Sequence, residues 1–289
     1  MLIRPMPGTD RDSLLKTLVH LHMEVGNVRS RGHTHLDLYN NYIAWVNESV
    51  RMLRHQVSPE DLERLVLTKR CWLLQSMAAL VVGPLAILVE TEIDDRLTAL
   101  GLACQALGSQ IQHWSGPGVF VVPDTSFYCH GDKLEDWDVS TFLATRHEPV
   151  HLLFPMVVVD ELDRLKQSKD DHVRWRARHT LEVLDRVLSD GQAGQFRDAD
   201  VTGVETGQIP KGKVTMEVVL DPPAHSRLPI ADDEIIDRAL AIQTLAGRPV
   251  TMVTCDTGQS HRARIRGLKC VKLPMPPGPE PQHPRRTRK

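Results

Sequence analysis

Apolar residues in the N-terminal 115 residues recur with the period of amphipathic helices. After Thr34 they fall at i, i+3, i+4 and i+7 from Leu38 to Leu53, which places them on one helical face. Helix starts are expected at Thr9-x-x-Asp12, Thr34-x-x-Asp37 and Ser58-Pro59, because serine and threonine cap helix N-termini and proline suits the first turn. This region is therefore predicted to form a bundle of about four helices.

The third helix is expected to run from Ser58 to about Val82, and a fourth from Gly83-Pro84 toward Ser109. The apolar run Cys71–Val89 crosses the junction between them and is nearly long enough to span a bilayer. Because Gly83-Pro84 divides this run into two shorter ones, a buried helical hairpin is favoured over a membrane span.

The C-terminal half changes to short apolar runs that alternate with helical patterns. Strands are expected at Val119–Val122, His151–Phe154, Val250–Thr254 and Leu268–Leu273, and helices at about 134–145, 157–188, 232–246 and 257–266. The irregular segment 189–229 is expected to be a loop with one strand, Val214–Val219. This alternation predicts an α/β fold with a parallel sheet of about five strands flanked by helices, preceded by the all-α bundle.

Punctuation along the chain suggests the domain limits. The cluster Ser115-Gly116-Pro117-Gly118 separates a helical domain, residues 1–115, from an α/β domain, residues 118–273. The remaining residues, 274–289, are proline-rich and end in basic residues, so we expect a disordered tail.

Composition narrows the class of protein. The 289 residues carry a net charge of −2 with histidine neutral, so any nucleic-acid binding needs a local basic patch. The five cysteines are scattered without a C-x-x-C pair, which argues against a disulfide framework and a cysteine zinc site. The N-terminus shows no apolar leader segment. Together these features predict a cytoplasmic protein that is not inserted in a membrane.

Acidic residues follow the predicted strands at the edge where α/β proteins bind ligands. Asp124 and Asp256 directly follow two strands, and Glu161 lies one helical turn past a third. Asp232 and Asp233 open a helix that starts at the same edge. Converging carboxylates repel one another unless a cation lies between them, and oxygen ligands without histidine or cysteine favour Mg²⁺ or Mn²⁺.

Each acid also has an ordinary structural explanation. Asp124 can be a turn residue, Asp232 a helix N-cap, and Glu161 a solvated helix position. Their shared position on one predicted sheet edge favours the metal site, where a cation activates water and neutralises charge at a scissile phosphate.

Four motifs along residues 118–273, about half the chain, resemble those of PIN-domain nucleases. They are Val121-Val122-Pro123-Asp124-Thr125-Ser126, Pro155-x-x-Val158-x-x-Glu161-Leu162-Asp163-x-x-Lys166, Asp232-Asp233-x-Ile235, and Val253-Thr254-Cys255-Asp256 with Ala263 and Gly267-Leu268. The second motif is most similar to a bacterial subgroup with an ELDxLK signature. The order and spacing of the four together carry the resemblance.

The resemblance implies a metal-dependent ribonuclease, in some relatives a DNA nuclease, on a parallel sheet. Carried over, the catalytic metal carboxylates are Asp124, Glu161, Asp233 and Asp256, with Asp232 as an alternative ligand to Asp233. The hydroxyls of Ser126 and Thr254 are expected to orient them, and Asp237, one turn further on, is a further supporting acid. Many relatives have asparagine where Ser126 stands, and serine keeps a hydrogen-bonding group there.

Basic residues that follow these motifs are weaker candidates for contacts with nucleic acid. Arg174 and Arg178 share a helix face at i and i+4, and Arg262 follows the last acid. Trp175, among arginines, is the aromatic residue best placed in the sequence to stack on a nucleotide. Solvated basic helix faces explain the same pattern.

The predicted function is hydrolysis of RNA by metal-activated water. Two alternatives remain: a non-catalytic module that binds RNA or protein on a degenerate nuclease fold, and a DNA nuclease of the flap-cleaving type. An inhibitory protein partner is implied only by the resemblance. The broad apolar helix faces of residues 1–115 favour assembly, for example as a homo-oligomer, over a grip on RNA, because their basic residues are interleaved with acids.

Overall fold

The computed structural model describes residues 3–77, 83–137, 143, 147–189, 191–202, 210–223 and 225–275, and it divides into two compact units. The first contains the chain up to Pro117 with Pro222–Ser226 and Asp237–Pro249. The second contains Gly118–Asp221, Arg227–Ile236 and the chain from Val250 on. Residues 78–82 of the expected hairpin, most of the helix expected at 134–145, and residues 276–289 of the expected tail lie outside the described residues.

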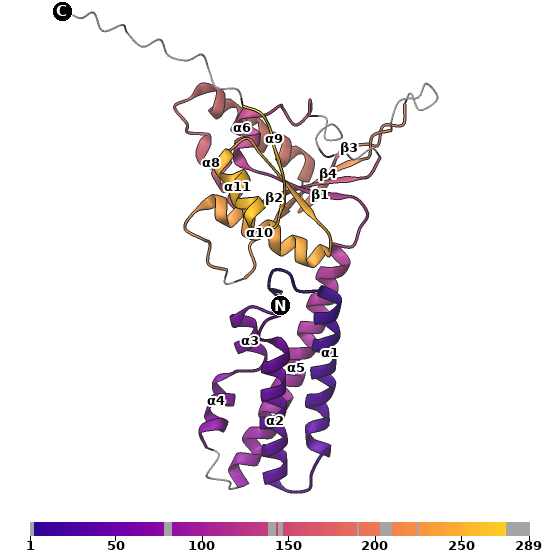
Figure 1. Cartoon of the computed structure of the whole chain (residues 1–289), viewed down its shortest axis with the longest axis vertical. Coiled ribbons are helices and arrows are strands. Elements are labelled where there is room, and N and C mark those ends of the chain that lie inside the picture. The colour runs from indigo at the N-terminus through magenta and orange to yellow at the C-terminus, as the bar shows by residue number, and fades with distance from the viewer. Residues whose placement is uncertain are drawn as a thin grey trace, which may run out of the picture. The chain divides into compact units, whose positions relative to one another are not determined.

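The first unit is helical, as the apolar periodicity predicted (Figure 1). Its helices are α1 (Arg11–Asn27), the short 3₁₀ helix η1 (Val28–Ser30), α2 (His35–Leu53), α3 (Pro59–Leu65), α4 (Lys69–Ser76) and α5 (Gly83–His113). Leu14, Leu18, Leu21 and Val25 form the buried stripe of α1. Their spacing of three to four residues places all four on the face that packs against the core.

Local capping explains where these helices begin. The capping box of Thr34 and Asp37 and the N-cap Ser58 are confirmed. The expectation at Thr9 is wrong by one residue, because the carboxylate of Asp10 accepts the capping bond from the backbone N–H of Ser13. The long helix expected from Ser58 is also wrong: it ends at Leu65, and Thr68 caps a new helix, α4.

The apolar run Cys71–Val89 is only partly buried where it is described. Cys71, Leu74 and Val89 are buried, whereas Trp72, Leu73 and Ile87 are 49–68% exposed. No helix among the described residues combines the length and apolar character that a membrane crossing requires.

The second unit is built on a six-stranded, mostly parallel sheet. Its strands are β1 (Val119–Pro123), β2 (Val150–Pro155), β3 (Ala193–Arg197), β4 (Val214–Val219), β5 (Val250–Thr254) and β6 (Lys269–Lys272), in the spatial order β3-β4-β2-β1-β5-β6. All neighbours are parallel except β3 and β4. The predicted α/β class is confirmed. The segment 189–229 contains two strands, however, because β3 returns antiparallel at the sheet edge.

Helices connect the parallel strands. They are α6 (Thr125–His130), α8 (Met156–Leu165), α9 (Asp171–Leu188), α10 (Ala231–Ala246) and α11 (Thr257–Ile265). The single helix expected at 157–188 is divided into α8 and α9, because the Asp170 side chain accepts hydrogen bonds from the backbone N–H groups of His172 and Val173 and starts a new helix.

The order of the strands determines where a ligand site can form. Central β1 pairs with β2 on one side and with β5 on the other. The connection from β1 to β2 therefore runs toward one edge of the sheet, and the connection from β5 to β6 runs toward the other edge. Such a switch point leaves a crevice beyond the carboxyl ends of the strands. Asp124 and Asp256 directly follow β1 and β5 at this edge, and Glu161 lies in α8, the helix that follows β2.

One arginine of α9 fastens this helix to the turn after α6. Arg176 is 5% exposed and donates hydrogen bonds to the carbonyl oxygens of Tyr128 (2.9 Å), Gly131 (3.0 Å) and Asp132 (2.6 Å). A planar guanidinium can reach three carbonyls at once, whereas an ammonium group cannot keep this geometry.

We therefore expect Arg176→Lys to lower the free energy of unfolding by about 2 kcal/mol, because buried carbonyls lose charge-assisted hydrogen bonds. Urea titration followed by circular dichroism measures this change. The matched control is Arg178→Lys, an exposed residue two positions along the same helix, which should change stability by less than about 0.5 kcal/mol. Equal effects of the two substitutions would contradict the anchoring role.

Candidate active site

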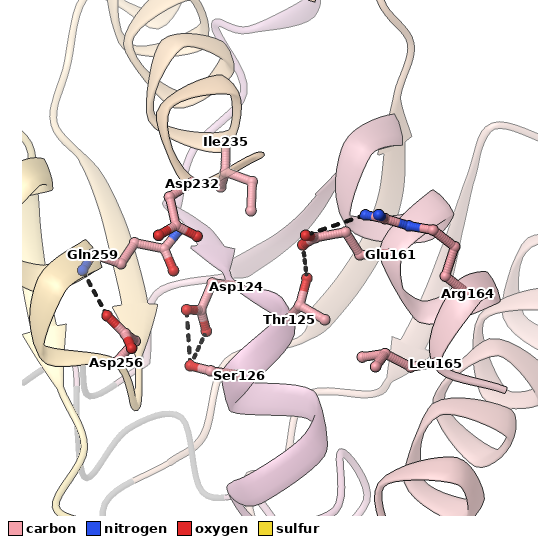
Figure 2. A pocket seen from close by; sticks show the side chains of 10 residues that line it. All are labelled: Asp124, Thr125, Ser126, Glu161, Arg164, Leu165, Asp232, Ile235, Asp256 and Gln259. Carbon is pink, nitrogen blue, oxygen red and sulfur yellow. Dashed lines mark hydrogen bonds and ion pairs between the residues drawn. The ribbon is translucent and has the colours of Figure 1, made fainter. Parts of the chain in front are cut away.

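A cavity of about 370 Å³ lies at the carboxyl edge of the sheet (Figure 2). It is lined by residues from four separate segments: Asp124, Thr125 and Ser126 after β1, Glu161, Arg164 and Leu165 of α8, Asp232 and Ile235 of α10, and Asp256 and Gln259 at the start of α11. Segments far apart in the sequence thus bring four carboxylates to one cavity.

Asp124 is the buried centre of this arrangement. It caps α6, is 1% exposed, and accepts hydrogen bonds from the backbone N–H of Phe127 (2.8 Å) and the hydroxyls of Ser126 (2.8 Å) and Thr254 (2.5 Å). These donors favour the ionised form, but burial outweighs them and raises the pKa of Asp124 to about 6.

The hydroxyls of Ser126 and Thr254 link the ends of β1 and β5. Ser126 Oγ and Thr254 Oγ1 lie 3.2 Å apart, and both contact Asp124. Ser126 also accepts from the backbone N–H of Cys255 at 2.9 Å, and Thr254 from that of Asp256 at 2.9 Å. Both residues singled out from the sequence as orienting groups are thus in contact with the buried carboxylate.

Glu161 belongs to α8 and contacts two residues that the sequence analysis did not single out as site residues. Its Oε2 accepts from the hydroxyl of Thr125 at 2.5 Å, and its Oε1 lies 3.4 Å from Nη2 of Arg164. Thr125 directly follows Asp124 in the first motif, so its position in the sequence could have identified it as a site residue. Arg164 lies one helical turn after Glu161, a spacing at which side chains of a helix meet.

The structure separates the adjacent acids Asp232 and Asp233. Asp232 lines the cavity, where burial, followed by the charge of Asp256, raises its pKa. Asp233 instead forms ion pairs with Arg262 (3.4 Å) and Arg266 (3.7 Å) and is not among the cavity-lining residues. Consecutive helical residues point about 100° apart, so only one of the two can face the cavity.

Two further acids complete the comparison with the sequence. Asp256 is exposed, caps α11 and accepts from the backbone N–H of Gln259 at 2.8 Å. Asp237, considered as a supporting acid, forms an ion pair with its neighbour Arg238 and is not among the cavity-lining residues.

The nucleic-acid candidates of α9 are engaged within the protein. Arg174 pairs with Asp171 and donates to the carbonyl of Ser168 at 2.6 Å, and Arg178 donates to the carbonyl of Lys166 at 3.4 Å. The ring of Trp175 stacks on His179 at 5.0 Å, with Lys133 Nζ 5.2 Å from its centroid. This stacking uses aromatic surface that a nucleobase would need.

The donor set of the cavity suits a hard divalent cation. Its described lining offers four carboxylates and two hydroxyl-bearing residues but no histidine or cysteine, as Mg²⁺ and Mn²⁺ prefer. The raised pKa values of Asp124 and Asp232 reflect burial together with neighbouring negative charge. Gln259 is 2% exposed, and its Nε2 has no hydrogen-bond partner among the described residues. This amide can therefore donate a hydrogen bond to a water or to an oxygen of a ligand.

The raised pKa of Asp124 makes the stability of the metal-free protein depend on pH. Because this pKa is about 6 in the fold and 3.8 for an unperturbed aspartate, the folded state binds the proton more tightly. The contribution of Asp124 to the free energy of unfolding should therefore fall by ~2 kcal/mol as pH rises from about 4 to about 6, and stay low above it.

Urea titrations of metal-stripped wild-type protein and Asp124→Asn between pH 4.5 and 7.5 measure this effect. The wild type should lose stability relative to the variant as pH rises, because asparagine does not titrate. A difference that stays constant with pH would mean that Asp124 ionises like an exposed aspartate.

Comparison with known proteins places this geometry in a family. The family model of the PIN domain matches residues 121–274, which is more than half of the chain and includes every acid of the cavity. No curated protein matches the chain. The chain therefore belongs to the PIN-domain family.

Proposed function

We propose that this protein is a metal-dependent ribonuclease. PIN domains are generally nucleases and typically use divalent metals. The observation that supports the proposal most strongly is the convergence of four carboxylates, from four segments of a PIN domain, on one cavity at the sheet edge. A phosphodiester is the substrate class that such a cation site serves.

Asp124, Glu161, Asp232 and Asp256 are the residues that would hold Mg²⁺ or Mn²⁺. The bound cation would supply charge neutralisation at the phosphate and activation of a water molecule. Thr254 and Ser126 hold both oxygens of Asp124 in a defined orientation, and Thr125 holds Oε2 of Glu161. Such hydrogen bonds to ligating carboxylates fix their direction before the cation binds.

The adjacent acids of α10 provide a matched test. Asp232→Asn should lower metal-dependent cleavage of a single-stranded RNA by about 100-fold or more, because it removes a ligand from the cavity. Asp233→Asn changes the same charge one residue away and should lower cleavage by less than about 10-fold, because Asp233 pairs with arginines. Cleavage is measured on gels with end-labelled RNA and added Mn²⁺ or Mg²⁺.

Thermal unfolding separates metal binding from catalysis. Mn²⁺ should raise the melting temperature of the wild type and of Asp233→Asn, but much less that of Asp232→Asn or Asp256→Asn, because a ligand that binds more tightly stabilises the folded state more. Equal shifts in all four proteins would contradict the site. Asp256→Asn purified in parallel also controls for contaminating nucleases.

The choice of substrate distinguishes the alternatives. A single-stranded RNA and a branched DNA with a single-stranded flap are offered to the same preparation. Cleavage of the DNA alone would overturn the RNA assignment. Metal binding without cleavage of either would favour a binding module on a degenerate nuclease fold.

A further inference from the structure

Loosely held arginines lie on two sides of the carboxylate cavity. Because β1 lies between β2 and β5, α8, which follows β2, and α11, which follows β5, enter the cavity from opposite sides. Figure 2 shows this arrangement, with Glu161 and Arg164 on one side of Asp124 and with Asp256 and Gln259 on the other. We call these the α8 rim, formed by Arg164, and the α11 rim, formed by Arg262 and Arg266.

The α8 rim carries a guanidinium that is mostly in solvent. The Arg164 side chain is 73% exposed, and its ion pair with Glu161 is long, at 3.4 Å. It is the only cationic side chain among the described lining residues of a cavity that contains four carboxylates. An exposed pair of this length contributes at most about 1 kcal/mol, so Arg164 can exchange Glu161 for another anion at little cost.

The α11 rim holds two guanidinium groups on one carboxylate oxygen. Arg262 and Arg266 are each 43% exposed and both approach Oδ1 of Asp233, at 3.4 and 3.7 Å. One positive charge therefore remains uncompensated within this group of three. This charge lies beside the cavity, because Asp233 directly follows Asp232, which is one of the cavity-lining residues.

Two other arginines of this unit, Arg227 and Arg176, are held more closely. Arg227 contacts Asp160 at 2.5 Å and Asp221 at 2.6 Å, and Arg176 is buried against three carbonyls. These close contacts assign Arg227 and Arg176 to the stability of the fold. The long, shared pairs of the two rims stabilise little, which leaves their charges available to a ligand.

A polyanion that reaches this cavity meets repulsion from the carboxylates unless cations meet it at the edges. Guanidinium groups bind phosphate oxygens through two parallel hydrogen bonds, which makes arginine suited to a nucleic-acid backbone. When Arg164 turns to a phosphate, Oε1 of Glu161 loses its positively charged partner.

We propose that a single RNA strand crosses the cavity from the α8 rim to the α11 rim, with phosphates bound by Arg164 on one side and by Arg262 and Arg266 on the other. This inference rests on the proposed ribonuclease function and adds the path of the substrate.

Binding of a fluorescein-labelled 20-nucleotide single-stranded RNA to the full chain tests the path. Fluorescence anisotropy is recorded in EDTA at several salt concentrations, so that no cleavage occurs. Arg164→Gln and the double substitution Arg262→Gln with Arg266→Gln should each weaken binding about 5-fold or more. Each should also reduce the slope of log K against log salt by about 0.7 per lost phosphate contact.

Arg186→Gln is the matched control. Arg186 is 64% exposed and has a similarly long ion pair of 3.8 Å with Glu135. It lies on α9, a helix that contributes no residue to the cavity lining. It should leave affinity and salt slope unchanged. Asp233→Asn should leave the affinity equal or increase it, because it removes a negative charge from the α11 rim.

Several results would overturn the path. They are a loss as large in Arg186→Gln as in the rim variants, a loss confined to one rim, or no effect of either rim. A second measurement keeps the metal site apart: Mn²⁺ should raise the melting temperature of Arg164→Gln at least as much as that of the wild type, and a smaller rise would place Arg164 in the metal site instead. If the wild type cleaves RNA but the rim variants bind RNA normally, the path is overturned and the proposed function is not. If the wild type shows no metal-dependent cleavage, the proposed function is overturned and the binding result still stands.

Discussion

The burial of one carboxylate, Asp124, is the constraint on which the rest of the site depends. Removing a charged group from water is costly unless hydrogen bonds replace the lost hydration. Here a backbone N–H and two hydroxyls do so, and the hydroxyls also join the ends of β1 and β5. The same contacts that make Asp124 tolerable in the interior thus hold the two strand ends at the distance the cavity requires.

Repulsion among carboxylates is the second consequence of this packing. Burial is the main cause that raises the pKa values of Asp124 and Asp232, and neighbouring negative charge adds to it. In the proposed function, a multivalent cation would relieve this unfavourable interaction, because one such ion compensates several carboxylates at once.

Ion pairs divide the surrounding charges into two groups. Close, multiply bonded arginines such as Arg176 and Arg227 belong to the fold, whereas the long pairs of Arg164, Arg262 and Arg266 contribute little to it. The neighbouring acids Asp232 and Asp233 show the same division on one helix. Asp232 lines the cavity, whereas Asp233 forms ion pairs with Arg262 and Arg266.

Much of this protein follows from its sequence alone. Buried parallel strands need apolar runs and crossover helices need a periodic apolar face. The positions of β1, β2, β4, β5 and β6 along the chain, and the acids after β1, β2 and β5, were therefore predictable. The edge strand β3 was not, because its sequence, AGQFR, lacks the apolar run of a buried strand and pairs only on one side. Only the tertiary structure shows that Asp232 rather than Asp233 lines the cavity. It also brings Thr125 and Arg164 into contact with Glu161. Spacing along a helix defines which residues share a face, but the rotation of that helix about its axis is set by tertiary packing.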